Sequence, residues 1–229
     1  MIEKMPFNGI PFCVFFSLFL LISIVHLLFC FFEKEKLRKI SKPFCVLLLS
    51  IAIIFISPSE YFIYVGLLFG VVGDILLLKK HKVWPLVIGT FFFFLNHCFF
   101  VIEAIKLCFP INDFIYFFMA FFPILFCLIT YYPFKKVFRQ GQLTFGGSIY
   151  CSFLSLDFLM MLVLSIMYKP KYLLISSLGG FAFIASDIFL CYTLFIKDVK
   201  RRDFFIMALY LIGQTLISFG LAFTFLLSI

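Results

Sequence analysis

The sequence predicts an all-α integral membrane protein, a single polytopic domain over residues 1–229 that folds as one bundle of eight transmembrane helices. Of the 229 residues, 65% are hydrophobic and 13% are charged, and the mean hydropathy is +1.19. Soluble domains are on average about 45–50% apolar and about 25% charged. The chain lacks the polar surface that a soluble globule needs, so its composition excludes soluble enzyme folds and disordered tails.

Eight apolar segments, separated by charged or turn-forming residues, mark the expected helices. A helix crosses the hydrocarbon core in about 20 residues. The first segment is too long for the apolar part of a signal peptide and ends in Phe-Phe-Glu, so we expect it to be retained as a helix. The second segment is short and ends at Ser57-Pro58. The expected helices cover residues 10–32, 43–57, 61–78, 85–107, 114–132, 148–168, 171–196 and 204–228.

The distribution of basic residues supports the helix count and gives an orientation. Fifteen of the 19 Lys and Arg residues lie in the alternate connections 33–42, 79–84, 133–147 and 197–203, and the other four are Lys4, Lys106, Lys169 and Lys171. Because basic residues gather in cytoplasmic loops, both termini are expected on the non-cytoplasmic side, in a bacterial inner membrane or an endoplasmic reticulum-type membrane. The same rule accounts for the net charge of +8 without a nucleic-acid partner.

Cysteine and histidine spacing gives no sign of a metal site. The eight cysteines form no Cys-x-x-Cys pair and mostly lie in apolar segments, where they act as small hydrophobic residues. A catalytic zinc site typically needs three protein ligands. His26 and His97 lie in different expected helices and His81 lies in a connection, so we expect neither a metal nor another cofactor.

Ionisable residues inside the expected spans are the candidate functional groups, because each costs at least about 2.5 kcal/mol to insert. Depth along the helices places Asp74, Asp187, His97 and Gln214 between the cytoplasmic end and the midplane, where they are expected to converge on one pocket open to that face. The ionisable residues in the spans are His26, Asp74, His97, Glu103, Asp157 and Asp187, and Asn96 and Gln214 are their neutral companions.

Three of these residues are not assigned to the expected pocket. His26 is expected to be a packed or interfacial histidine. Glu103 is expected to reach the outer headgroups beside Lys106. Asp157 has a depth similar to that of the four converging residues, but its neighbours match no known pattern.

On the third expected helix, Gly66, Gly70 and Gly73 leave one face bare for close packing.

Four motifs in chain order resemble the YhhN-like lysoplasmalogenase family. They are Gly70-Val-Val-Gly73-Asp74, Gly89-x3-Phe93-x3-His97-x2-Phe100, Gly180-Phe-Ala-Phe183-Ile-Ala-Ser186-Asp187 and Tyr210-x3-Gln214-x-Leu-Ile217. Two positions depart from the family pattern. Phe100 stands where the family has tyrosine, and Gly213 stands where it has alanine.

The resemblance implies hydrolysis of the vinyl ether bond of lysoplasmalogens, with a lysophospholipid as substrate and membrane lipid as surroundings. Asp74 and Asp187 are then the expected catalytic pair, and His97, Gln214, Asn96 and Ser186 the expected substrate-binding residues. Vinyl ether hydrolysis needs a proton donor for the alkene carbon and water for the resulting cation. A low-dielectric site favours the neutral form of a carboxyl group, so one aspartate can stay protonated at neutral pH.

A second class of function fits the same carboxylates. Paired acids inside a membrane are as typical of proton- or cation-coupled transporters as of hydrolases. A purified hydrolase releases aldehyde from a lysoplasmalogen, whereas a transporter leaves that lipid intact.

The charge asymmetry generates a topology prediction. In a variant without the eight native cysteines, new cysteines near residues 38 and 200 should react with an impermeant maleimide only after the membrane is opened, because both connections are expected to be cytoplasmic. Labelling of these cysteines from outside intact cells would contradict the orientation.

Overall fold

The computed structural model describes residues 9–79, 83–109, 112–137, 141–169 and 171–227, and within these ranges all regular structure is helical. This confirms the predicted all-α membrane fold. The helices are α1 (Gly9–Phe31), α2 (Glu35–Ile56), α3 (Tyr61–Leu76), the 3-10 turn η1 (Leu77–Lys79), α4 (Val83–Leu107), α5 (Asp113–Val137), α6 (Gly141–Tyr168), α7 (Lys171–Phe195) and α8 (Arg202–Leu227).

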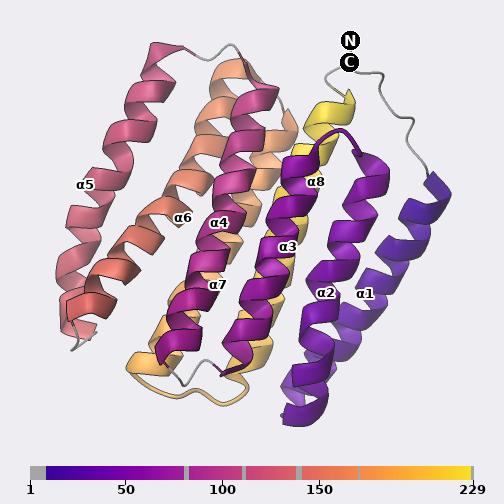
Figure 1. The fold of residues 1–229 in the computed structure, drawn as a ribbon, viewed down its shortest axis with the longest axis vertical. Helices are drawn as coiled ribbons and strands as arrows, with labels where there is room; N and C mark the ends of the chain where they lie inside the picture. The colour runs from indigo at the N-terminus through magenta and orange to yellow at the C-terminus, as the bar shows by residue number, and fades with distance from the viewer. Residues whose placement is uncertain (1–8, 80–82, 110–111, 138–140, 170, 228–229) are drawn as a thin grey trace.

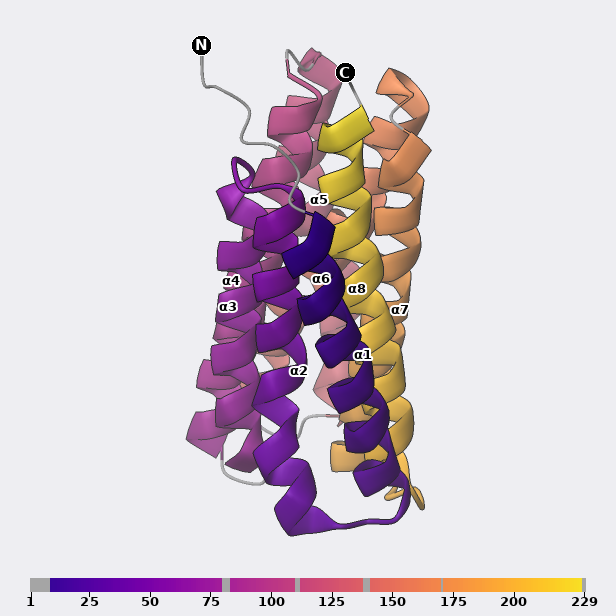
Figure 2. The same cartoon turned by 90° about the vertical axis from the view of Figure 1, so that its right-hand side faces the viewer.

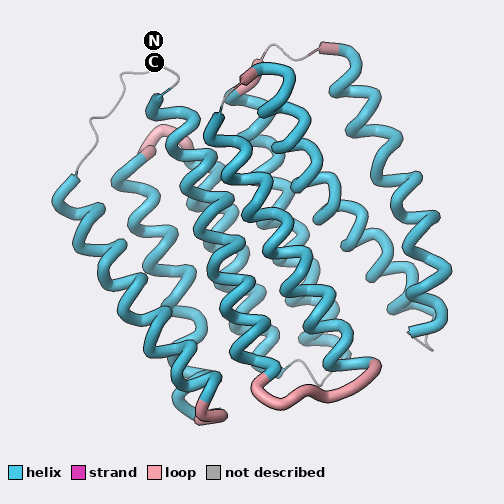
Figure 3. The backbone as a smooth tube through the Cα atoms, turned by 180° about the vertical axis from the view of Figure 1, so that it is seen from behind, coloured by secondary structure: helices cyan, strands magenta, loops and turns pink. Residues whose placement is uncertain are grey.

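Successive helices run up and down, so the start of α1 and the end of α8 lie at the same end of the bundle (Figure 1). The connections α1–α2 and α7–α8 lie at the opposite end, as the view from behind also shows (Figure 3). This arrangement places alternate connections on one side, as the distribution of Lys and Arg requires. The structure therefore agrees with eight crossings.

Length and composition make this a multi-pass membrane protein. Seven of the described helices are long and apolar enough to cross a membrane, and α3 is a shorter apolar helix of 16 residues. At about 1.5 Å per residue for α3 and about 2.0 Å for η1, the two together reach about 30 Å, the thickness of a hydrocarbon core. The 3-10 turn thus completes the third crossing.

The expected start of the second helix at residue 43 was wrong, because α2 begins at Glu35 and Pro43 lies within it. The segment before the proline consists mostly of Glu, Lys, Leu and Arg, which are good helix formers. A Lys39–Glu35 ion pair of 2.5 Å supports this first part of the helix, and Arg38 pairs with Asp203 at the start of α8. The basic segment is therefore helical rather than a loop.

Two other expected boundaries were also wrong. Helix α5 continues to Val137 rather than ending at residue 132, and α6 begins at Gly141 rather than at residue 148. Both extensions carry polar residues. Dividing the sequence into apolar segments leaves such residues out, although a helix tolerates them at the membrane interface. The remaining boundaries differ from expectation by one or two residues.

Helix α8 is the centre of the bundle. It packs against α7 most extensively and also against α1, α2, α3 and α4 (Figure 2). Helices α1 and α5 are peripheral: α1 contacts α2 and α8, and α5 packs against α6. Large apolar side chains such as Leu21 on α1 and Leu128 on α5 are exposed, as expected where lipid covers the protein.

Glycines let α7 and α8 approach each other closely. A Cβ atom at Gly179 would lie 2.7 Å from the backbone nitrogen of Ile217 and 2.8 Å from the carbonyl oxygen of Gly213. One at Gly213 would lie 3.0 Å from the Gly179 carbonyl oxygen. Such small-residue contacts are the usual way in which membrane helices pack.

Gly179→Ala should therefore lower the stability of the folded protein by about 1–3 kcal/mol, the cost of adding volume to a closely packed contact. The measurement is the thermal unfolding midpoint of the purified protein in detergent. Gly146→Ala is the matched control, because a Cβ atom at Gly146 meets nothing within 4 Å. Equal midpoints for the two variants would contradict the close α7–α8 contact.

Candidate active site

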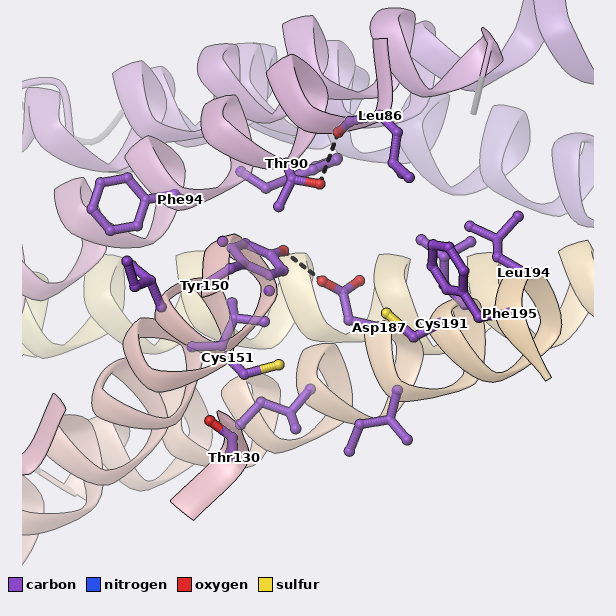
Figure 4. A pocket seen from close by; sticks show the side chains of 18 of the residues that line it. Leu86, Thr90, Phe94, Thr130, Tyr150, Cys151, Asp187, Cys191, Leu194 and Phe195 are labelled. Atoms are coloured by element: carbon purple, nitrogen blue, oxygen red, sulfur yellow. Dashed lines mark hydrogen bonds between the residues drawn. The ribbon is translucent and has the colours of Figure 1, made fainter. Parts of the chain in front are cut away.

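Asp187 on α7 lies at the wall of a large apolar cavity. The cavity has a volume of about 710 Å³ and is lined by residues of α4, α5, α6 and α7 and of the turn after α3. The Tyr150 hydroxyl on α6 donates a 2.5 Å hydrogen bond to Asp187 Oδ2, and Figure 4 shows both side chains at the cavity. Asp187 is the only Asp, Glu, Lys or Arg among the described lining residues, so the cavity combines one carboxyl group with apolar walls.

Asp74 on α3 is held inside the bundle by two partners. Its side chain is 1% exposed, and its Oδ1 lies 3.0 Å from Lys42 Nζ on α2. The Tyr210 hydroxyl on α8 donates a 2.8 Å hydrogen bond to Asp74 Oδ2. The long side chain of Lys42 brings a positive charge from the basic end of α2 to a buried carboxylate. Three helices thus meet at Asp74.

An aromatic layer of three packed rings, those of Phe93, Phe183 and Tyr210, connects the cavity wall to the tyrosine that contacts Asp74. Phe93, which lines the cavity, meets Tyr210 at 5.7 Å and Phe183 at 6.0 Å, and Phe183 meets Tyr210 at 5.4 Å between ring centroids. Asp187 lines the cavity and Asp74 does not, so the two carboxyl groups have different surroundings.

His97 on α4 is paired with Asp157 on α6. Its Nδ1 lies 2.7 Å from Asp157 Oδ2, and both side chains are buried. The other polar atoms, His97 Nε2 and Asp157 Oδ1, have no hydrogen-bond partner. The His97 ring packs against Phe183 at 4.3 Å, which joins this pair to the aromatic layer. Phe100, at the family's tyrosine position, is also buried, with its ring centroid 5.8 Å from that of His97.

The neutral polar residues form separate contacts. Gln214 Nε2 donates a 2.9 Å hydrogen bond to Asn96 Oδ1, while Gln214 Oε1 and Asn96 Nδ2 have no partner. A Cβ atom at Gly70 would lie 3.7 Å from Gln214 Nε2, so this pair packs next to the bare face of α3. The Ser186 hydroxyl donates to the Ile206 carbonyl at 2.9 Å, which links α7 to α8.

The expectation that four polar residues share one pocket was wrong in that form. The cavity is lined by Asp187 but not by Asp74, His97 or Gln214. Each of these three has its own buried partner, because a polar group in an apolar interior must be satisfied locally. We call these buried polar residues, together with their partners, the polar network. They lie in separate contacts inside the bundle rather than around one open space.

Sequence reasoning missed three partners. Lys42 was placed in a loop, Tyr150 was not considered, and Asp157 was noticed without a partner. The rule that an intramembrane acid needs a partner was a usable signal for Asp157, since His97 is the one histidine at similar depth. No sequence spacing joins Tyr150 to Asp187, which lie on different helices.

His26 and Glu103 lie apart from this network. His26 is buried and its Nδ1 lies 2.7 Å from the Ser41 hydroxyl, in agreement with a packed histidine. The expectation that Glu103 reaches the headgroups was wrong, because its side chain is buried and lies 3.4 Å from Lys106 Nζ. Lys106 also pairs with Glu60, which precedes α3.

Glu60 completes a charged cluster at the end of the bundle where α2 meets α3. Burial raises the pKa of the Glu60 carboxyl group, but hydrogen bonds with Glu103 and Lys106 outweigh that effect and hold the pKa below its usual value. The cluster thus keeps a negative charge beside Lys106 and is a local structural contact between α4 and the residue before α3.

Within the described ranges, no three His, Cys, Asp or Glu side chains lie close enough to hold a metal ion. His81 lies outside these ranges. The chemistry available at Asp187 is proton transfer by a carboxyl group, assisted by a tyrosine hydroxyl and by neighbouring charges.

Comparison with known proteins agrees with the four motifs. A model of the YhhN family matches residues 37–221, which include all the residues of the polar network. No curated protein and no solved structure matches the chain significantly. The match extends from α2 into α8 and covers most of the chain, so this protein belongs to the YhhN family.

Proposed function

We propose that this protein hydrolyses the vinyl ether bond of lysoplasmalogens within the bilayer. The products are a fatty aldehyde and glycerophosphoethanolamine or glycerophosphocholine. The observation that carries the proposal is the position of Asp187, a carboxyl group hydrogen-bonded to Tyr150 at the wall of an apolar cavity. Membership of the YhhN family and the order of its motifs support the same reaction.

Protonated Asp187 is the proton donor in this proposal. It transfers its proton to the alkene carbon that does not bear the oxygen, and the adjacent carbon becomes an oxocarbenium ion. The Tyr150 hydroxyl occupies Oδ2, which leaves Oδ1 to carry the proton toward the substrate. An apolar cavity favours the neutral acid before the transfer, and general acid catalysis of this type contributes about 10²–10⁴-fold.

Water completes the reaction. It adds to the oxocarbenium carbon and gives a proton back to the Asp187 carboxylate, so the catalyst is regenerated. The hemiacetal that forms then splits into aldehyde and alcohol, and one water is consumed for each bond broken. The exchange of acid and base roles by one carboxyl group has a parallel in the retaining glycosidases.

Asp74 is proposed as the second carboxylate, which stabilises the cation. Lys42 favours the ionised form of Asp74, and the charge of Asp74 acts on Asp187. His97 and Gln214 are proposed to orient water or the glycerol hydroxyl, because each has an unpaired polar atom. Asn96 supports Gln214, and Ser186 holds α7 against α8 beside Asp187.

The decisive experiment is release of aldehyde from a lysoplasmalogen by the purified protein in lipid nanodiscs. An alkyl ether analogue, which has no alkene to protonate, should remain intact. If the lysoplasmalogen also remains intact and the protein instead carries protons or cations across vesicle membranes, the transporter alternative replaces the hydrolase.

Removal of either acid should abolish most of the activity. Asp74→Asn and Asp187→Asn keep side-chain volume but remove proton donation and negative charge, so each should lower turnover at least about 100-fold. Glu103→Gln is the matched control, since it makes the same chemical change at a buried acid in the separate cluster near Lys106. Thermal unfolding must show that the Asn variants remain folded. Parental turnover in a folded Asp74→Asn, Asp187→Asn variant would refute the assignment.

The tyrosine that contacts Asp187 should matter less than the acid itself. Tyr150→Phe removes a hydrogen bond to a group that is charged during the reaction, worth about 1.5–3 kcal/mol, so turnover should fall about 10- to 100-fold. Steady-state kinetics of aldehyde release give this number. Tyr116→Phe, on the exposed face of α5, is the control for loss of a hydroxyl group. Equal rates for the two variants would remove Tyr150 from the site.

A further inference from the structure

We infer that the cavity between α4, α5, α6 and α7 binds the hydrocarbon chain of a single-chain lipid, which enters sideways from the bilayer. This inference rests on the proposed function, because it assigns the part of the substrate that does not react. Four features of the cavity support it: its walls, its rim, its volume and its one acidic side chain.

The walls of the cavity are apolar along most of their length. Leu86 and Phe94 on α4 face Leu154 on α6 and Leu194 on α7, and Figure 4 shows Leu86 and Leu194 on opposite sides of the space. Few hydroxyl groups line the walls, and that of Thr90 donates to the Leu86 carbonyl within its own helix. Such walls are as apolar as the lipid tails of the bilayer, so a hydrocarbon chain that moves from the bilayer into the cavity keeps apolar surroundings.

The rim of the cavity points to lipid rather than to water. Several large apolar lining residues are exposed: Phe91 on α4 is 54% exposed, Ile188 on α7 is 61% exposed, and Ile196, just after α7, is 58% exposed. Exposed apolar side chains at the rim of a cavity fit contact with lipid better than contact with water. The peripheral helix α5 contributes Phe126 and Thr130 to the lining and packs against α6.

The volume fits one chain. A cavity of about 710 Å³ holds about two dozen groups of the size of a water molecule, whose share of liquid volume is about 30 Å³. A methylene group has nearly that size, so one long chain fits and the two chains of a diacyl lipid do not. Asp187 and Tyr150 form a polar part of the cavity wall, so the polar end of the bound lipid is expected next to them.

Gly146 on α6 offers a direct way to fill this space. It lines the cavity, and a Cβ atom built there meets no atom within 4 Å. Gly146→Phe therefore adds a ring at the cavity wall, at a position where the backbone has room for a side chain. Leu128→Phe adds a ring to the exposed face of α5 and is the matched control, because Leu128 is 69% exposed and does not line the cavity.

Fluorescence quenching measures chain binding without hydrolysis. Trp84 is the one tryptophan of the chain, so Trp84→Phe gives a dark background in which Phe94→Trp reports on the cavity. Phe121→Trp, on the exposed face of α5, reports on ordinary lipid contact. The probes are a single-chain alkyl ether phospholipid and a diacyl phospholipid, each with bromine on its chains, in vesicles of equal bromine content.

The single-chain probe should quench the Phe94→Trp reporter more strongly than the diacyl probe does, while the two probes quench the Phe121→Trp reporter equally. Gly146→Phe should abolish the excess quenching, and Leu128→Phe should preserve it. Equal quenching of the Phe94→Trp reporter by both probes, or excess quenching that survives Gly146→Phe, would overturn the inference.

The same preparations separate this inference from the proposed reaction. Excess quenching without aldehyde release from a lysoplasmalogen would support the chain site and refute the hydrolase. Aldehyde release without excess quenching would support the hydrolase and refute the chain site. Unfolding midpoints near that of the parent show that the two Phe variants are folded.

Discussion

A carboxyl group inside a bilayer must find its partners within the protein, and this requirement governs how the helices of the bundle are joined. Asp74 on α3 holds Lys42 on α2 and Tyr210 on α8. His97 and Asp157 join α4 to α6, and Asp187 joins α7 to Tyr150 on α6. Three acids thus link six helices, and the two helices without such a link, α1 and α5, are the peripheral ones.

The same partners that hold the helices also set the chemistry. Breaking a buried ion pair by removing one member costs about 3–5 kcal/mol, because the remaining charge stays buried. The carboxylates proposed to be catalytic are therefore also structural ones. The unpaired atoms of His97, Asp157, Asn96 and Gln214 are different, since an unsatisfied buried polar group costs about 1–3 kcal/mol and stabilises no helix contact. Such atoms fit a site that orients water or a polar substrate group.

The fold was predictable from the sequence because hydrophobic length and basic connections are local properties of the chain. The helix boundaries at Glu35 and Gly141 were not, since polar residues at a membrane interface can be helical or not. For the candidate site, depth and motif order singled out Asp74, Asp187, His97 and Gln214 but not the pairs that these residues form. Tyr150 and Lys42 meet their aspartates only through the packing of separate helices, which no spacing within the sequence encodes.

The candidate site has two different sides, which the packed rings of Phe93, Phe183 and Tyr210 connect. Asp187 faces the apolar cavity, where a neutral acid and a hydrocarbon chain are both stable. Asp74 faces Lys42 and the polar interior, where an ionised carboxylate is stable. The proposed reaction needs both environments, since the uncharged alkene is protonated first and a cation forms afterwards. On this proposal the surroundings alone distinguish the two roles, because the apolar cavity favours the neutral acid at Asp187 and the lysine partner favours the carboxylate at Asp74.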